Sequence, residues 1–106
     1  MKEEEGGKKF DQGKPKVSLI PFEALMKVAE VFTFGAKKYG DHNWRRGIKF
    51  SRTSSAHYRH RMQHDMGNDL DVESGIFHLA HSIANDMMEL YFMIKGREEL
   101  DDRPKE

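Results

Sequence analysis

The chain has 106 residues, enough for one small domain or one subunit of an oligomer. Its eighteen basic and eighteen acidic side chains give a formal charge of zero, so the overall charge does not favour direct DNA or RNA binding or binding to a membrane surface. It contains no cysteine, which excludes disulfides, zinc–thiolate sites and thiol nucleophiles.

The ends of the chain differ in composition from its middle. Residues 1–10 are charged and contain glycine, so we expect a disordered leader, and residues 97–106 form a charged tail of similar character. Residues 11–96 are expected to form a single domain. No apolar run approaches membrane-spanning length, and the leader lacks the apolar core of a secretory signal, so we expect a cytoplasmic protein.

The first expected helix begins near Pro21, because the first helical turn does not need the N–H that proline lacks. It ends before Gly40, with Lys37 and Lys38 in the last turn, where cations are favourable. Its apolar residues recur at spacings of three and four and form one stripe of Phe22, Leu25, Ala29, Phe32, Ala36 and Tyr39.

The second expected helix runs from Ser51, a suitable N-cap, to Met66, and Gly67 ends it. Few of its residues are apolar. One side carries neighbouring polar residues at helical spacing, namely His57, His60, Arg61 and His64. A helix this polar either faces solvent or lines a polar site.

The third expected helix is capped by Asp71, runs to Lys95 and stops at Gly96. It is apolar around much of its circumference, which predicts that it is the central element. One polar line crosses it, formed by His78, His81, Ser82, Asn85 and Glu89. Buried polar groups need partners, and a metal, water, a ligand or the polar second helix can supply them.

These patterns predict an all-α fold without strands. Three helices of this kind seldom enclose a core alone, so we expect a helical bundle of about three main helices per chain, completed by oligomerisation as a homodimer or homotetramer.

Five of the six histidines lie between residues 57 and 81, and that window also holds the acidic residues Asp69, Asp71 and Glu73. Closely spaced carboxylates can converge on a divalent cation, although a polar turn capped by Asp71 explains them equally well. His78 and His81 share one helical face opposite His60 and His64, which favours a site that binds a metal or transfers protons.

A second candidate region is the loop of residues 39–47, which contains Asn43 and Trp44. Tryptophan can stack on a base and asparagine can bind a base edge, although the loop taken alone is explained slightly better by a buried Trp44 that anchors it. Lys14, in the segment of residues 11–16, would add a cation to a phosphate site if that segment is more than a leader.

Many short motifs appear in one order along residues 11–95: Gly-Lys-Pro at 13–15, Leu-Ile-Pro at 19–21, Phe-Gly-Ala-Lys-Lys-Tyr-Gly at 34–40, Asn-Trp at 43–44, Arg-His at 59–60, Gly67, Asp-x-Asp-x-Glu-Ser-Gly at 69–75, and His-Leu-Ala-His at 78–81 with Asn85. This series resembles the phage dATP/dGTP diphosphohydrolase family, the MazZ-like branch of the all-α MazG-type nucleotide pyrophosphohydrolases. The resemblance implies an oligomeric helical enzyme of the host cytoplasm. It would use Mg²⁺ or Mn²⁺ to cleave a purine deoxynucleoside triphosphate, dATP or dGTP, to monophosphate and pyrophosphate, and so reshape the nucleotide pool during infection.

The broader superfamily carries Glu-x-x-Glu and Glu-x-x-Asp ligand motifs, and the corresponding helices of this chain carry histidines instead. Such a site suits Mn²⁺ better than Mg²⁺, unless the acidic loop alone holds the metal. The expected metal ligands are Asp69, Asp71, Glu73, His78, His81 and Asn85. The expected general base is His60 or His81. The expected substrate-binding residues are Lys14, Lys38, Asn43, Trp44, Arg59 and Arg61.

The missing carboxylate motifs leave a second hypothesis open. The chain would then be a nucleotide-binding or sequestering module that uses the same pocket without hydrolysis.

Overall fold

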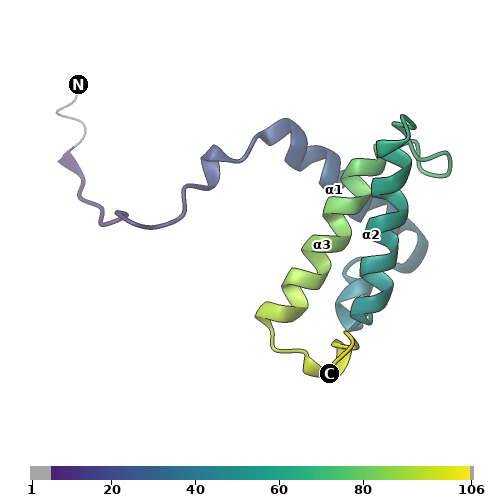
Figure 1. Cartoon of the computed structure of the whole chain (residues 1–106). Helices are drawn as coiled ribbons and strands as arrows, with labels where there is room; N and C mark the ends of the chain where they lie inside the picture. The colour runs from purple at the N-terminus through teal and green to yellow at the C-terminus, as the bar shows by residue number, and fades with distance from the viewer. Residues whose placement is uncertain (1–5, 106) are drawn as a thin grey trace.

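The computed structural model describes residues 6–105, which form three α-helices (Figure 1). The helices are α1 (Phe22–Tyr39), α2 (Phe50–Asp65) and α3 (His78–Ile94). Short 3-10 turns precede α1, connect α1 to α2 and follow α3, at Val17–Leu19, Asn43–Arg46 and Glu98–Leu100. No strand occurs in this part of the chain, so the all-α prediction is confirmed; Leu70 and Phe77 form an isolated antiparallel bridge. None of the helices described is long and apolar enough to cross a membrane.

The third helix is the central element, because it packs against both α1 and α2. Figure 1 shows α2 and α3 lying side by side, whereas residues 6–21, the N-terminal arm, extend away from the helices. The molecule is accordingly elongated, with extents of 53 × 35 × 30 Å. Residues 6–10 of the expected leader are exposed, and residues 1–5 lie outside the described part of the chain.

The predicted boundaries of α1 are confirmed. Pro21 is its N-cap, and Gly40 follows its last residue with a φ of 96° that favours glycine. The apolar stripe is only partly covered: Phe22 and Tyr39 at its two ends are 67% and 66% exposed, and the buried residue of α1, Val28, lies beside the stripe. One chain therefore does not bury the whole apolar face of α1.

Ser51 does not cap α2, contrary to the prediction. The helix begins at Phe50 with Lys49 as its N-cap residue, and Ser51 lies within the first turn. The cap comes from the C-terminal segment: Asp102 accepts a hydrogen bond from the Ser51 N–H at 2.8 Å and one from the Ser51 hydroxyl at 2.5 Å. A carboxylate at this position satisfies a free N–H and favours the helix dipole.

The predicted start of α3 is wrong, because the helix begins at His78 and not after Asp71. Residues 71–77 form a turn instead. The Gly75 N–H donates to the Asp71 carbonyl at 2.7 Å, the Asp71 N–H donates to the Ile76 carbonyl at 2.9 Å, and Gly75 has a φ of 74°. The Asp71 carboxylate accepts the Ser74 N–H and does not cap α3. The turn folds the acidic loop, residues 67–75, back beside the first turn of α3.

The charged segment after α3 is structured, although its composition resembles that of the leader. Leu100 is 8% exposed and packs with Phe50 and Phe92, and Trp44 and Tyr91 pack around these three residues. Arg97 donates to the carbonyls of residues 45 and 46 at 3.2 and 3.0 Å. These contacts close the core at the C-terminal end of α3.

Candidate functional site

The polar line of α3 obtains its partners from α2. The Ser82 hydroxyl donates to the His57 carbonyl at 2.7 Å, and the Thr53 hydroxyl donates to the Glu89 carboxylate at 2.7 Å. Within residues 6–105, no buried side-chain nitrogen or oxygen lacks a hydrogen-bond partner. The sequence had left a metal, water, a ligand or the second helix as possible partners. For Ser82 and Glu89, the partner is the second helix, α2.

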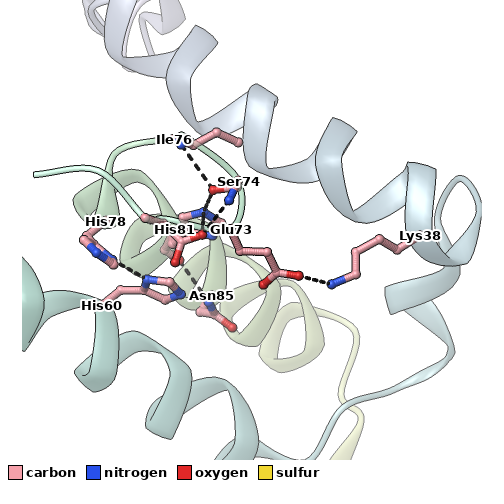
Figure 2. Close-up of polar contacts among 9 residues, drawn as sticks. Lys38, His60, Glu73, Ser74, Ile76, His78, His81 and Asn85 are labelled. Atoms are coloured by element: carbon pink, nitrogen blue, oxygen red, sulfur yellow. Dashed lines mark hydrogen bonds and ion pairs between the residues drawn. The ribbon is translucent and has the colours of Figure 1, made fainter.

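Three elements bring possible metal ligands together at the start of α3. His60 of α2, Asp71 of the acidic loop and His78 of α3 offer ligand atoms that all lie within 4.8 Å of one another. His78 is 7% exposed, and its Nδ1 lies 2.8 Å from the Nδ1 of His60 (Figure 2). Two imidazoles and one carboxylate thus converge from segments that are separated in the sequence.

His81 lies against this group. Its ring stacks on that of His60, with centroids 4.3 Å apart and an interplanar angle of 11°. Its Nε2 lies 2.8 Å from the Ser74 hydroxyl, as Figure 2 shows, and 4.0 Å from the Asp71 carboxylate. The Ser74 hydroxyl also accepts the Ile76 N–H at 3.2 Å. Ser74 therefore connects the acidic loop to His81.

Ser74 had no predicted role. The signal that could have identified it is its position three residues after Asp71, the spacing at which an aspartate side chain accepts a backbone N–H in a turn.

Burial favours the neutral form of two of these histidines. Burial first, and then the charge of nearby His81, lower the pKa of His60 to about 4. Burial likewise lowers the pKa of His81, although Asp71 opposes this. For Asp71, burial raises the pKa, but hydrogen bonds from the Ser74 N–H and hydroxyl and the nearby histidines lower it more, so the net direction is downward. The lowered pKa values favour neutral rings for His60 and His81 and an ionised carboxylate for Asp71 at neutral pH.

This donor set can bind a cation. A neutral imidazole offers a free nitrogen lone pair, and a carboxylate supplies charge. Imidazole ligands suit divalent transition metals such as Zn²⁺ and Fe²⁺ best; the mixed set also admits Mn²⁺, which binds its carboxylate, whereas Mg²⁺ prefers oxygen ligands alone.

The other predicted metal ligands lie outside the three-residue group. Glu73 forms an ion pair with Lys38 of α1 at 2.9 Å, which Figure 2 also shows. Asn85 donates to the carbonyl of His81 on its own helix at 2.9 Å. Asp69 is exposed, and its carbonyl accepts the His78 N–H at 2.8 Å.

A cleft of about 1030 Å³ lies along the second half of α2 and the acidic loop. Five predicted site residues line it: Arg59, His60, Asp69, Asp71 and His78. The predicted histidine and acidic segments therefore share one concave surface, which is the usual shape of a small-molecule site.

The remaining predicted substrate-binding residues lie apart from this cleft or are paired. Arg61 is paired with Asp65 at 3.1 Å. Lys14 lies in the N-terminal arm beside a separate cavity of about 540 Å³. Trp44, next to Asn43, packs on Tyr91 with ring centroids 5.1 Å apart. Tyr91 lies about ten residues beyond His81, or roughly 15 Å along the helix.

Comparison with known proteins shows which protein family the chain matches. The family described as dATP/dGTP diphosphohydrolase, N-terminal, matches residues 4–103. A dATP/dGTP diphosphohydrolase of Salmonella phage PMBT28 is 40% identical over 97 residues, which cover 92% of this chain and 33% of that protein. The chain thus spans about a third of the length of this relative. No solved structure matches it significantly.

Proposed function

Because the chain belongs to the dATP/dGTP diphosphohydrolase N-terminal family, we propose that it hydrolyses purine deoxynucleoside triphosphates, dATP and dGTP, to monophosphate and pyrophosphate. The observation that carries the proposal is the group of His60, Asp71 and His78 at the cleft. The similarity to a phage protein supports a role in changing the purine nucleotide pool of an infected cell.

The residues present fit a divalent transition metal better than Mg²⁺. We propose that His60, Asp71 and His78 hold Mn²⁺ or a similar ion, because two of the three donors are imidazole nitrogens. The low pKa of His60 supports this, since a neutral ring keeps its lone pair for a metal. When bound, the ion would neutralise phosphate charge and polarise the bond that is cleaved.

His81 is the proposed general base. It lies outside the three-residue group but in contact with it, and burial keeps its pKa below the ordinary value, so its ring is unprotonated at neutral pH. Its Nδ1, the ring nitrogen that does not contact Ser74, would accept the proton of the attacking water. Ser74 would orient the ring through the 2.8 Å contact with Nε2.

Arg59 is the proposed phosphate ligand, because it lines the same cleft. Lys38 and Arg61 would have to exchange their present partners, Glu73 and Asp65, for a phosphate. Asp69, which lines the cleft, would help to hold the metal ion, and Glu73 and Asn85 would do so only after leaving Lys38 and the His81 carbonyl.

A homodimer or homotetramer is part of the proposal. Large apolar side chains are exposed at helical spacing on α3, namely Ile83, Met87, Leu90 and Ile94, and the arm carries further exposed ones. In an oligomer, Lys14 of the arm would reach a site only on a neighbouring subunit. Light scattering of the purified protein measures the oligomeric state directly.

The function is tested by incubating the purified protein with dATP or dGTP and Mn²⁺ or Mg²⁺ and measuring monophosphate and pyrophosphate. Asp71→Asn removes the charged ligand at nearly constant shape, so turnover should fall about a hundredfold or more, with an unchanged circular dichroism spectrum. Asp41→Asn is the matched control, because Asp41 is exposed in the α1–α2 connection. Wild-type turnover in Asp71→Asn would contradict the proposed site.

The same assay distinguishes the alternative function, a module that binds nucleotide without hydrolysing it. The histidines that stand where the broader superfamily carries carboxylate motifs are the reason for this alternative. Stoichiometric nucleotide binding without a monophosphate product would establish it.

A further inference from the structure

We propose that the same cleft also binds the purine base, over Met62, Met66 and Leu70, and that the paired amides of Gln63 and Asn68 contact the edge of the base. This inference rests on the proposed function for the identity of the ligand. It moves the base away from Asn43 and Trp44, where the sequence predicts it.

The shape of the cleft supports this placement. The cleft that contains His60 and Asp71 continues along α2 to Gln63 and Met66. At the α-helical rise, Gln63 lies about 5 Å and Met66 about 9 Å beyond His60. A nucleotide separates its 5′ phosphates from its base by one sugar ring. Phosphates at His60 would therefore bring the base within reach of the last turn of α2 and Met66, which follows it.

This part of the cleft has an apolar surface that a base can cover. Met62, Met66 and Leu70 all line it and are 61%, 65% and 51% exposed. Methionine side chains are flexible and polarisable, and they adapt to the flat face of an aromatic ring. Apolar lining with a few polar groups at one side is typical of ligand sites.

The polar groups are two amides that already bind each other. The Asn68 side-chain N–H donates to the Gln63 side-chain oxygen at 2.8 Å, and the Asn68 backbone N–H donates to the Gln63 carbonyl at 2.9 Å. Each residue also lines the cleft. Their contact leaves an amide N–H of Gln63 and the side-chain oxygen of Asn68 for a ligand, and neither meets another partner within residues 6–105.

An adjacent donor and acceptor match the edge of either purine. Adenine presents an acceptor, N1, beside its N6 donor, and guanine presents a donor, N1–H, beside its O6 acceptor. If Gln63 and Asn68 both rotate their amides, the hydrogen bond between them is kept and the outward donor and acceptor exchange places. The pair can therefore bind adenine in one orientation and guanine in the other, in agreement with the two proposed substrates.

The base site that the sequence predicted, at Asn43 and Trp44, is less open to a ligand. The Trp44 ring is in contact with the rings of Phe32, Tyr91 and Phe92, at centroid distances of 5.6, 5.1 and 5.7 Å. The Arg45 guanidinium also lies over the Trp44 ring at 5.3 Å, so a base would compete with these groups for a ring that is only partly exposed.

The test is the affinity of the whole protein, with Mn²⁺, for the non-hydrolysable α,β-imido analogues of dATP and dGTP, measured by calorimetry. Gln63→Glu makes both outward atoms acceptors, which suit the N1–H and N2–H donors of guanine. The ratio of the dissociation constants, dATP analogue over dGTP analogue, should rise about tenfold. Gln12→Glu makes the same chemical change in the exposed arm and should leave the ratio unchanged.

The outcomes separate this inference from the proposed function. The base site would be overturned by any of three results. The ratio of dissociation constants could stay unchanged in Gln63→Glu, it could shift in Asn43→Asp and not in Gln63→Glu, or the wild type could bind neither analogue. Should Gln63→Glu not fold, Asn68→Asp in the loop also adds an outward acceptor and gives the same readout. A shifted ratio without any pyrophosphate release from dATP or dGTP would keep the base site and refute hydrolysis.

Discussion

The two ends of α3 both carry side chains that commonly bind ligands, and they differ in what those side chains contact. The histidine end consists of His60, Asp71, Ser74, His78 and His81. The aromatic end consists of Trp44, Phe50, Phe92 and Leu100. At the histidine end, polar atoms from three segments converge beside a cleft. At the aromatic end, rings pack on one another, and the residues described include no comparable group of possible metal ligands there.

The difference shows how a residue type acquires a role. Trp44 can stack on a base in principle, but here its ring is used to hold the loop before α2 against α3. A histidine such as His81 is also buried, yet its Nε2 meets a hydroxyl group and a carboxylate. We therefore expect substitutions at the histidine end to change activity and substitutions at the aromatic end to change stability.

The largest expected effect is the loss of catalysis in His81→Gln. Glutamine can keep a hydrogen bond to Ser74 but cannot accept a proton at neutral pH, so kcat should fall about a hundredfold to ten-thousandfold. Pyrophosphate release under saturating dATP measures it, and thermal unfolding checks that the fold persists. A kcat within a few fold of wild type would show that His81 is not the base.

A large loss of stability is expected for Phe92→Ala at the aromatic end. Phe92 is fully buried, so its removal leaves a cavity and should lower the free energy of unfolding by about 3–5 kcal/mol. Urea unfolding followed by Trp44 fluorescence measures the change. Where the variant remains folded, kcat should stay near the wild-type value, and a selective loss of kcat would mean that the two ends are coupled.

The smallest expected effect is a pH dependence of stability that comes from the histidine end. The pKa of His60 is lowered from about 6.5 in the unfolded chain to about 4 in the fold, so the unfolded chain binds the proton more readily. The free energy of unfolding is therefore unaffected by His60 above pH 6.5, and it decreases as the pH falls from 6.5 towards 4. The lowered pKa of His81 acts in the same direction, and that of Asp71 does so only in more acidic solution.

Melting temperatures of the metal-free protein, measured between pH 7.5 and 4.5, test this dependence. His60→Gln should flatten the decline between pH 6.5 and 4.5. His42→Gln is the control, because His42 is exposed in the loop after α1. An equal decline in His60→Gln and wild type would show that His60 does not carry the effect.

Local signals predicted the helices well where they agreed with the packing. Helix α1 begins after Pro21 and ends before Gly40, as expected, and Gly96 follows α3 with a φ of 67°. The start of α3 could not be predicted, because Ile76 and Phe77 continue the apolar pattern of the helix. A bridge between Leu70 and Phe77 and the positive φ of Gly75 keep them in the preceding turn.

The C-terminal segment illustrates the same limit. Its charged composition resembles that of the leader, and a single apolar residue, Leu100, gives little periodic signal. Its order comes from contacts with distant residues: Leu100 packs on Phe50 and Phe92, and Asp102 binds Ser51. Composition measures average polarity and does not register one buried side chain.

The sequence by itself determined that the chain is helical and that five of its six histidines, with three acidic residues, lie between residues 57 and 81. Both properties are local, since a helix closes its hydrogen bonds within four residues and residue type sets the available chemistry. Only the tertiary structure decided which groups meet. His60 and His78 are 18 residues apart in the chain, and Asp71 reaches them because the acidic loop folds back on α3. Glu73 in the same loop points to Lys38 instead, because packing of α1 against α3 brings that lysine within reach.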